Sequence, residues 1–206
     1  MGRATVPRRL RQEDTRFARL VSLACHDLGT PLATVHGFAR VLLSGGALGS
    51  TETRYTEVIE AASAQIAELV ESLSLVARIE GDRYQPTLRP SNTLTLARAV
   101  RDRLGHERVA VTGQGGAVAV DPGATEAAVA ALADCAHRHG GVGRVAVEAG
   151  DPELRLRPIP GHATPIILAE ELRDFGAAVA RAHVEALGGW LELAGEALVV
   201  RLPHHT

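Results

Sequence analysis

The chain has 206 residues, a length that suits one large domain or two small ones. Hydrophobic residues make up 46% of it and aromatic residues only 3%, so its cores must be built from Ala, Val and Leu. The formal net charge of -2 provides no basic field, which argues against nucleic acid as a partner. All basic residues other than histidine are arginine, and this excludes a P-loop, whose chemistry needs a lysine.

The first residues and the two cysteines bear on where the protein works. Residues 1–16 are polar and arginine-rich, unlike a signal peptide. No apolar run approaches the roughly 18 residues that a membrane helix needs. Cys25 and Cys135 lack metal-site or CxxC spacing and are interpreted as reduced thiols. We therefore expect a cytoplasmic protein without membrane contact.

Two apolar series with alternating steps of four and three residues occupy the first half of the chain. Such 3.5-residue spacing predicts supercoiled helices. A glycine-rich break over residues 44–50 separates the series, with Ser50 as the expected N-cap of the second helix. We expect residues 1–13 to be flexible and residues 14–80 to form a helical hairpin. The series are Phe17, Val21, Ala24, Leu28, Pro31, Val35, Phe38 and Leu42, then Tyr55, Ile59, Ala62, Ile66, Leu69, Leu73 and Val76.

Two helices alone cannot cover both apolar series. Pairing of two hairpins into a four-helix bundle would cover them, so the sequence predicts a homodimer. The alternative is that the series pack on the second half of the same chain.

The heptad register predicts an exposed His26. With Ala24 at d and Leu28 at a, His26 falls at f, the position furthest from the contact. Pro31, five residues later, cannot donate to the carbonyl of Asp27, at a cost of about 3 kcal/mol inside a helix. A proline inside a helix is unfavourable, and its place beside an exposed His-Asp pair points to a functional site. His36, at b without a neighbouring acid, is interpreted as a surface residue.

Residues 24–32 read Ala-Cys-His-Asp-Leu-Gly-Thr-Pro-Leu. This segment resembles the phosphoacceptor box of two-component sensor histidine kinases, a His-Asp/Glu-x-x-Thr-Pro pattern. The resemblance implies that His26 is phosphorylated, as suits a neutral imidazole near pH 7. It also implies that Asp27 accepts a proton or orients the ring, and that Thr30 positions the water that removes phosphate.

Two further residues of the box are expected to have structural roles. Pro31 bends the helix beside the histidine. Gly29 departs from the arginine or lysine that is usual in the family, which removes a charge and weakens the helix.

Residues 81–90 form the expected linker, and residues 91–206 the second domain. Helices separated by paired short strands predict an α/β sandwich, which makes the chain α+β overall. This order, and the sequence of residues 179–189, resemble the catalytic ATP-binding domain of histidine kinases. The expected helices cover residues 91–104, 123–139 and 169–187, and the expected strands cover residues 108–112, 117–120, 144–149, 153–157, 190–194 and 197–202.

The resemblance also shows what this second domain has lost. Cys135 stands where the family carries an asparagine that holds magnesium, and a neutral thiol is a poor ligand for so hard an ion. The turn that reads adenine is reduced to Arg-Pro-Ile-Pro and Gly161, without an acid, and Gly176 alone remains of the glycine-rich phosphate loop. We therefore expect a degenerate ATPase-like domain with no cofactor, neither ATP nor Mg²⁺, and no metal site.

Together these features predict a phosphorelay protein that exchanges a phosphoryl group between His26 and a response-regulator aspartate. Its expected partners are a second copy of itself, a receiver domain and, as another donor, a partner histidine kinase. Two alternatives stay open: an active sensor-type kinase with a divergent ATP site, and a non-catalytic dimeric adaptor of the pseudokinase type.

Overall fold

The computed structural model describes residues 8–46 and 48–204, and within these ranges not the side chains of residues 8–17, 19 and 20. The chain divides into two compact units, Met1–Tyr84 and Gln85–Thr206. The first consists of two long helices and the second contains a five-stranded sheet with helices, so the expected α+β class is confirmed. Over the described ranges, every helix falls short of the length and apolarity needed to cross a membrane.

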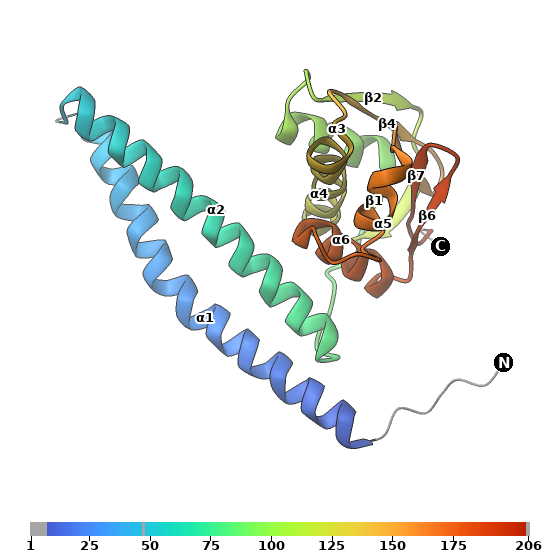
Figure 1. Cartoon of the computed structure of the whole chain (residues 1–206), viewed down its shortest axis with the longest axis horizontal. Helices are drawn as coiled ribbons and strands as arrows, with labels where there is room; N and C mark the ends of the chain where they lie inside the picture. Colours follow the sequence, from blue (N-terminus) through green and yellow to red (C-terminus); the bar gives the residue numbers. More distant parts are fainter. Residues whose placement is uncertain (1–7, 47, 205–206) are drawn as a thin grey trace. The chain divides into compact units, whose positions relative to one another are not determined.

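Helix α1 (Arg8–Ser44) and helix α2 (Ser50–Glu80) pack along each other as a hairpin (Figure 1). Helix α1 begins six residues before the expected start of the hairpin at residue 14. The expected N-cap of α2 is wrong by one position, because Gly49 is the cap and Ser50 is already helical. The Thr53 N–H donates to the Gly49 carbonyl oxygen at 2.9 Å, which closes the first turn around Gly49 instead of Ser50.

Small side chains make the contact between α1 and α2. On both helices, each of these small residues directly follows a member of the apolar series that the sequence predicted, so they too recur at heptad spacing. The large apolar side chains of the predicted series, such as Phe38, Val35 and Ile66, stay exposed in the single chain. The side chain of Phe17 lies outside the described residues. The buried members of the contact are Ala18, Cys25 and Ala39 on α1, and Thr56, Ser63 and Ala77 on α2.

This shift by one position also moves His36, which was wrongly predicted to lie on the surface. It is half-buried, with its Nδ1 3.2 Å from the Ser63 Oγ and its Nε2 3.8 Å from a Glu60 carboxylate oxygen. The His36 side chain therefore provides a polar contact within the interface between the two helices.

The second unit is a mixed sheet covered by helices on one face (Figure 1). The strand order is β2-β4-β5-β7-β6, in which only β2 and β4 run parallel. Strands β1 and β3 form a separate antiparallel pair. The elements are β1 (Arg89–Asn92), α3 (Thr93–Leu104), β2 (Val109–Gly113), β3 (Ala117–Val120), α4 (Pro122–Gly140), β4 (Val145–Ala149), β5 (Glu153–Arg157), a 3-10 turn (Gly161–Ala163), α5 (Thr164–Ile167), α6 (Phe175–Ala186), β6 (Trp190–Ala194) and β7 (Ala197–Arg201).

Alternate residues of the strands face the helices and form the core of this unit. They are aliphatic, as the shortage of aromatic residues requires, and pack against the alanine-rich faces of α4 and α6. Fully buried members include Val145, Val147, Leu154, Leu156, Leu198 and Val200 from the strands, with Leu132, Ala133, Ala177, Ala180 and Val184 from the two helices.

The helix expected over residues 169–187 is wrong at its start. The short helix α5 ends at Ile167, and α6 begins only at Phe175. The N–H groups of Glu170 and Glu171 both donate to the Pro165 carbonyl oxygen, at 2.8 and 2.9 Å, and hold this segment as a turn. β1 also occupies residues that were assigned to the linker and to the first turn of the next helix.

Candidate functional site

His26 points away from α2 on the middle of α1. Its side chain is 81% exposed, so the predicted outward orientation is observed in the single chain. Its Nδ1 lies 3.2 Å from Oδ1 of Asp27, which is itself 69% exposed. The pair forms because neighbouring residues on an outward helix face can turn their side chains toward each other without losing any buried contact. The ring is therefore accessible to another protein and oriented by a carboxylate.

This contact is compatible with a tautomer in which Nε2 is the reactive nitrogen. When Nδ1 carries the proton and donates it to Asp27, Nε2 keeps its lone pair and faces solvent. A neutral imidazole nitrogen is a good nucleophile near pH 7. When the ring then gains positive charge during attack on phosphorus, the adjacent carboxylate stabilises that charge or accepts the Nδ1 proton. The arrangement can therefore support phosphoryl transfer to Nε2.

The helix continues through Pro31 rather than ending there. Thr30 lies one turn after His26 and is exposed on the same side of α1. The Thr34 hydroxyl donates to the Thr30 carbonyl oxygen at 3.1 Å, an i to i−4 side-chain bond of the kind that often bends helices. The sequence thus places Thr30 beside the histidine, where its hydroxyl is open to solvent.

Gly29 weakens the helix without a packing reason in the hairpin. A Cβ at this position would meet no atom within 4 Å, and the backbone is not in the left-handed region. We therefore expect Gly29→Ala to raise the free energy of unfolding by about 0.5 to 1 kcal/mol, through helix propensity alone. Thermal unfolding followed by circular dichroism measures this, and a lower melting temperature for the variant would contradict it.

The degenerate positions of the second unit lie in or near the packing of α4, α6 and the 3-10 turn. Cys135 on α4 is fully buried, and burial, reinforced by the charge of Asp174, raises the pKa of its thiol to about 12. Gly176 lies in the first turn of α6, where a Cβ would come within 3.2 Å of the Ala131 Cβ. Gly161 opens the 3-10 turn, with no atom within 4 Å of a Cβ placed there. Cys135 and Gly176 are therefore part of a closely packed helix interface.

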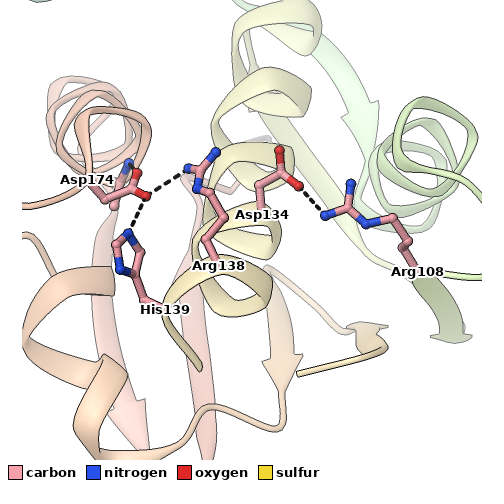
Figure 2. Close-up of polar contacts among 6 residues, drawn as sticks. Arg108, Asp134, Arg138, His139 and Asp174 are labelled. Atoms are coloured by element: carbon pink, nitrogen blue, oxygen red, sulfur yellow. Dashed lines mark hydrogen bonds and ion pairs between the residues drawn. The ribbon is translucent and has the colours of Figure 1, made fainter. Parts of the chain in front are cut away.

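An ionic cluster that the sequence reading did not predict lies at this interface (Figure 2). Asp174 is buried and caps α6, since its Oδ1 accepts from the Ala177 N–H at 3.0 Å. Its Oδ2 accepts from the Arg138 Nη2 at 2.7 Å and lies 3.0 Å from the His139 Nε2. Burial tends to raise the pKa of this carboxylate. The hydrogen bonds and ion pair from Ala177, Arg138 and His139 outweigh burial and lower the pKa below its usual value. The signal in the sequence was an aspartate directly before an alanine-rich helix, in the N-cap position.

Because its pKa is lowered in the folded protein, Asp174 stabilises the fold at neutral pH. We expect Asp174→Ala to lower the free energy of unfolding by about 1 to 3 kcal/mol at pH 7, from the lost cap and buried ion pair. The stabilisation is present above the usual carboxyl pKa of 3.8 and is lost as pH falls through the lower folded value. Denaturant unfolding of both proteins from pH 7 to pH 3 measures the difference, and a constant difference over that range would contradict the assignment.

Comparisons with known proteins agree with this division of the chain. Residues 18–82 match the family model of the His Kinase A (phospho-acceptor) domain. No curated protein matches the chain. Among solved structures, the full-length ShkA structure in complex with AMPPNP aligns with a TM-score of 0.63 at 18% identity over 88% of this chain. The Acinetobacter baumannii histidine kinase AdeS aligns with a TM-score of 0.56 at 19% identity, over 88% of this chain and 98% of that one. This chain spans only 44% of the ShkA chain, and at these identities the likeness concerns the fold alone.

Proposed function

This chain carries a His Kinase A (phospho-acceptor) domain of the two-component histidine kinase family over residues 18–82, and from that premise we propose that it is a phosphorelay protein. His26 accepts a phosphoryl group from the aspartyl phosphate of a response-regulator receiver domain, or returns the group to such an aspartate. The observation that carries the proposal is the exposed imidazole of His26, held by Asp27 at 3.2 Å within the matched residues.

The transfer is balanced without any cofactor. The lone pair of the His26 Nε2 attacks phosphorus, an N–P bond forms, and the P–O bond to the receiver aspartate breaks with the carboxylate as leaving group. Asp27 stabilises the positive ring or takes the proton from Nδ1. Thr30, exposed one turn away, is suited to orient the water that hydrolyses an aspartyl phosphate docked at the same face.

The exposed apolar series of the hairpin support a homodimer. Phe38 is 67% exposed, Val58 62% and Ile66 50%, and they belong to or flank a heptad pattern that the α1–α2 contact leaves uncovered. Exposed large apolar side chains at regular heptad spacing support an interface with another helix pair. Two hairpins that bury these series against each other make a four-helix bundle, with His26 of each copy on the outside.

The second unit is proposed to act without ATP or Mg²⁺. The Asp174 carboxylate sits at the N-terminus of α6, where a nucleotide phosphate would need a positive or neutral environment. The Cys135 thiol is buried and protonated, and Gly176 packs against Ala131 rather than leaving an open loop. These residues are a poor fit to a magnesium nucleotide, which supports the proposal that the phosphoryl group comes from another protein.

Two parallel reactions test the proposal. In one, the protein is incubated with a receiver domain that carries labelled aspartyl phosphate, and in the other with labelled Mg-ATP alone. We expect label on this protein from the receiver and none from ATP. Label from ATP alone would instead establish an active kinase with a divergent nucleotide site, and label from neither donor, with several receivers tried, would favour a non-catalytic adaptor.

A further inference from the structure

We propose that Cys135, His139 and Asp174 form a binding site for one divalent transition-metal ion, of which Zn²⁺ fits best. The three side chains each offer one ligand atom, and these atoms all lie within 4.8 Å of one another. The site is independent of His26 and of the phosphoryl transfer proposed above.

The fold brings the three ligands together from two elements. Cys135 and His139 are four residues apart on α4, a spacing that places both side chains on one face of a helix. Asp174 faces them from the residue before α6, with its Oδ2 3.0 Å from the His139 Nε2. Since Asp174 is fixed by its bond to the Ala177 N–H, its second oxygen remains turned toward α4. The ligands are therefore positioned before any ion arrives.

The kind of donor atoms selects the metal. One sulfur, one imidazole nitrogen and one carboxylate oxygen form a mixed set of the kind that Zn²⁺ accepts, with water as a fourth ligand. A thiol sulfur does not suit Mg²⁺ or Ca²⁺, which take oxygen ligands. The site thus differs in chemistry from a magnesium site for a nucleotide.

Charge and access also fit one cation. The ion replaces the proton of the Cys135 thiol, which leaves to solvent, so that a thiolate and the Asp174 carboxylate offset its two positive charges. Arg138 competes with the ion, because its Nη2 lies 2.7 Å from the same Asp174 oxygen. Its side chain is 55% exposed, however, and can turn into solvent. His139 is 26% exposed and marks the route by which an ion reaches the buried sulfur.

Titration of the full chain with Co²⁺, as a spectroscopic substitute for Zn²⁺, tests the site. We expect one equivalent of Co²⁺ to produce a near-ultraviolet thiolate-to-cobalt band, which Zn²⁺ then abolishes by displacement. We expect Cys135→Ser and His139→Gln to weaken binding by at least about 100-fold, whereas Cys25→Ser retains the band. The chain's second cysteine thus provides a matched control for adventitious thiol binding, and circular dichroism verifies that each variant is folded.

The variant Arg138→Gln distinguishes a metal-binding role of this cluster from a purely stabilising ion pair. Removing the competing guanidinium should tighten Co²⁺ binding several-fold, even though the variant loses the Arg138–Asp174 bond. The proposal is overturned if the unaltered protein gives no band, if the band persists in Cys135→Ser and His139→Gln, if it disappears in Cys25→Ser, or if Arg138→Gln weakens binding.

Discussion

His26→Gln should reduce phosphoryl transfer from a labelled receiver domain by at least about 1000-fold, to background. A glutamine amide nitrogen has no available lone pair, so the nucleophile is lost rather than weakened. The substitution should leave the fold intact, because the side chain is 81% exposed and its polar contact is with the neighbouring Asp27. The measurement is the initial rate of label transfer at equal protein concentration.

A matched control is His106→Gln, since His106 is also exposed and also lies near an aspartate, with its Nε2 4.0 Å from the Asp102 Oδ1. We expect this variant to accept label at the unaltered rate. Asp27→Asn should fall between the two, with a loss of about 10- to 100-fold, because the amide can still orient the ring but cannot carry the charge. Transfer to His26→Gln at more than a few per cent of the original rate would contradict the assigned nucleophile.

The second large effect is expected at the exposed apolar series of the hairpin. Phe38→Glu should raise the dissociation constant of the dimer by about 1000-fold, because each dimer carries the change twice. An aromatic side chain at the centre of an interface contributes about 2 kcal/mol or more, and two copies therefore correspond to roughly three powers of ten. Analytical ultracentrifugation over a concentration series measures the shift.

Ala33→Glu is the control for Phe38→Glu. It adds the same charge to an exposed position of α1 and keeps a good helix former, but lies outside the predicted series. This variant should remain as dimeric as the unaltered protein. If Phe38→Glu leaves the association unchanged, the exposed series do not join two copies, and the four-helix bundle is excluded.

The hairpin shows how far heptad spacing alone can be read. The spacing predicted both helices and the outward position of His26, because the 3.5-residue period and the glycine-rich break are local properties. It did not show which of two adjacent heptad series joins α1 to α2. The structure uses the small residues around Cys25, Ser63 and Ala77, and so brings His36 into the contact. The choice between the two adjacent series depends on how the side chains of α1 and α2 fit together in size. The spacing within one helix does not contain that information.

The second unit shows the opposite limit. Its helices and strands were predicted closely because its apolar runs are separated by clear turn residues. The error at residues 169–174 arose because Pro165 accepts two backbone bonds from Glu170 and Glu171, a turn without a simple sequence signal. The cluster around Asp174 was missed because its partners Arg138 and His139 lie 36 and 35 residues away in sequence. Cys135 and His139 lie four residues apart on α4, yet no metal-site spacing was assigned to Cys135 from the sequence.

The residue that receives the phosphoryl group decides whether this chain works as the proposed phosphorelay protein. After incubation with a phosphorylated receiver domain, fragmentation mass spectrometry of the peptide that spans α1 locates the group, and this peptide contains both His26 and His36. We predict one phosphoryl group on His26 and none on His36, whose ring is engaged by Ser63 and Glu60. A phosphoryl group on any other residue, or a phosphorylated His26 found only when ATP is supplied in place of the receiver, would contradict the account.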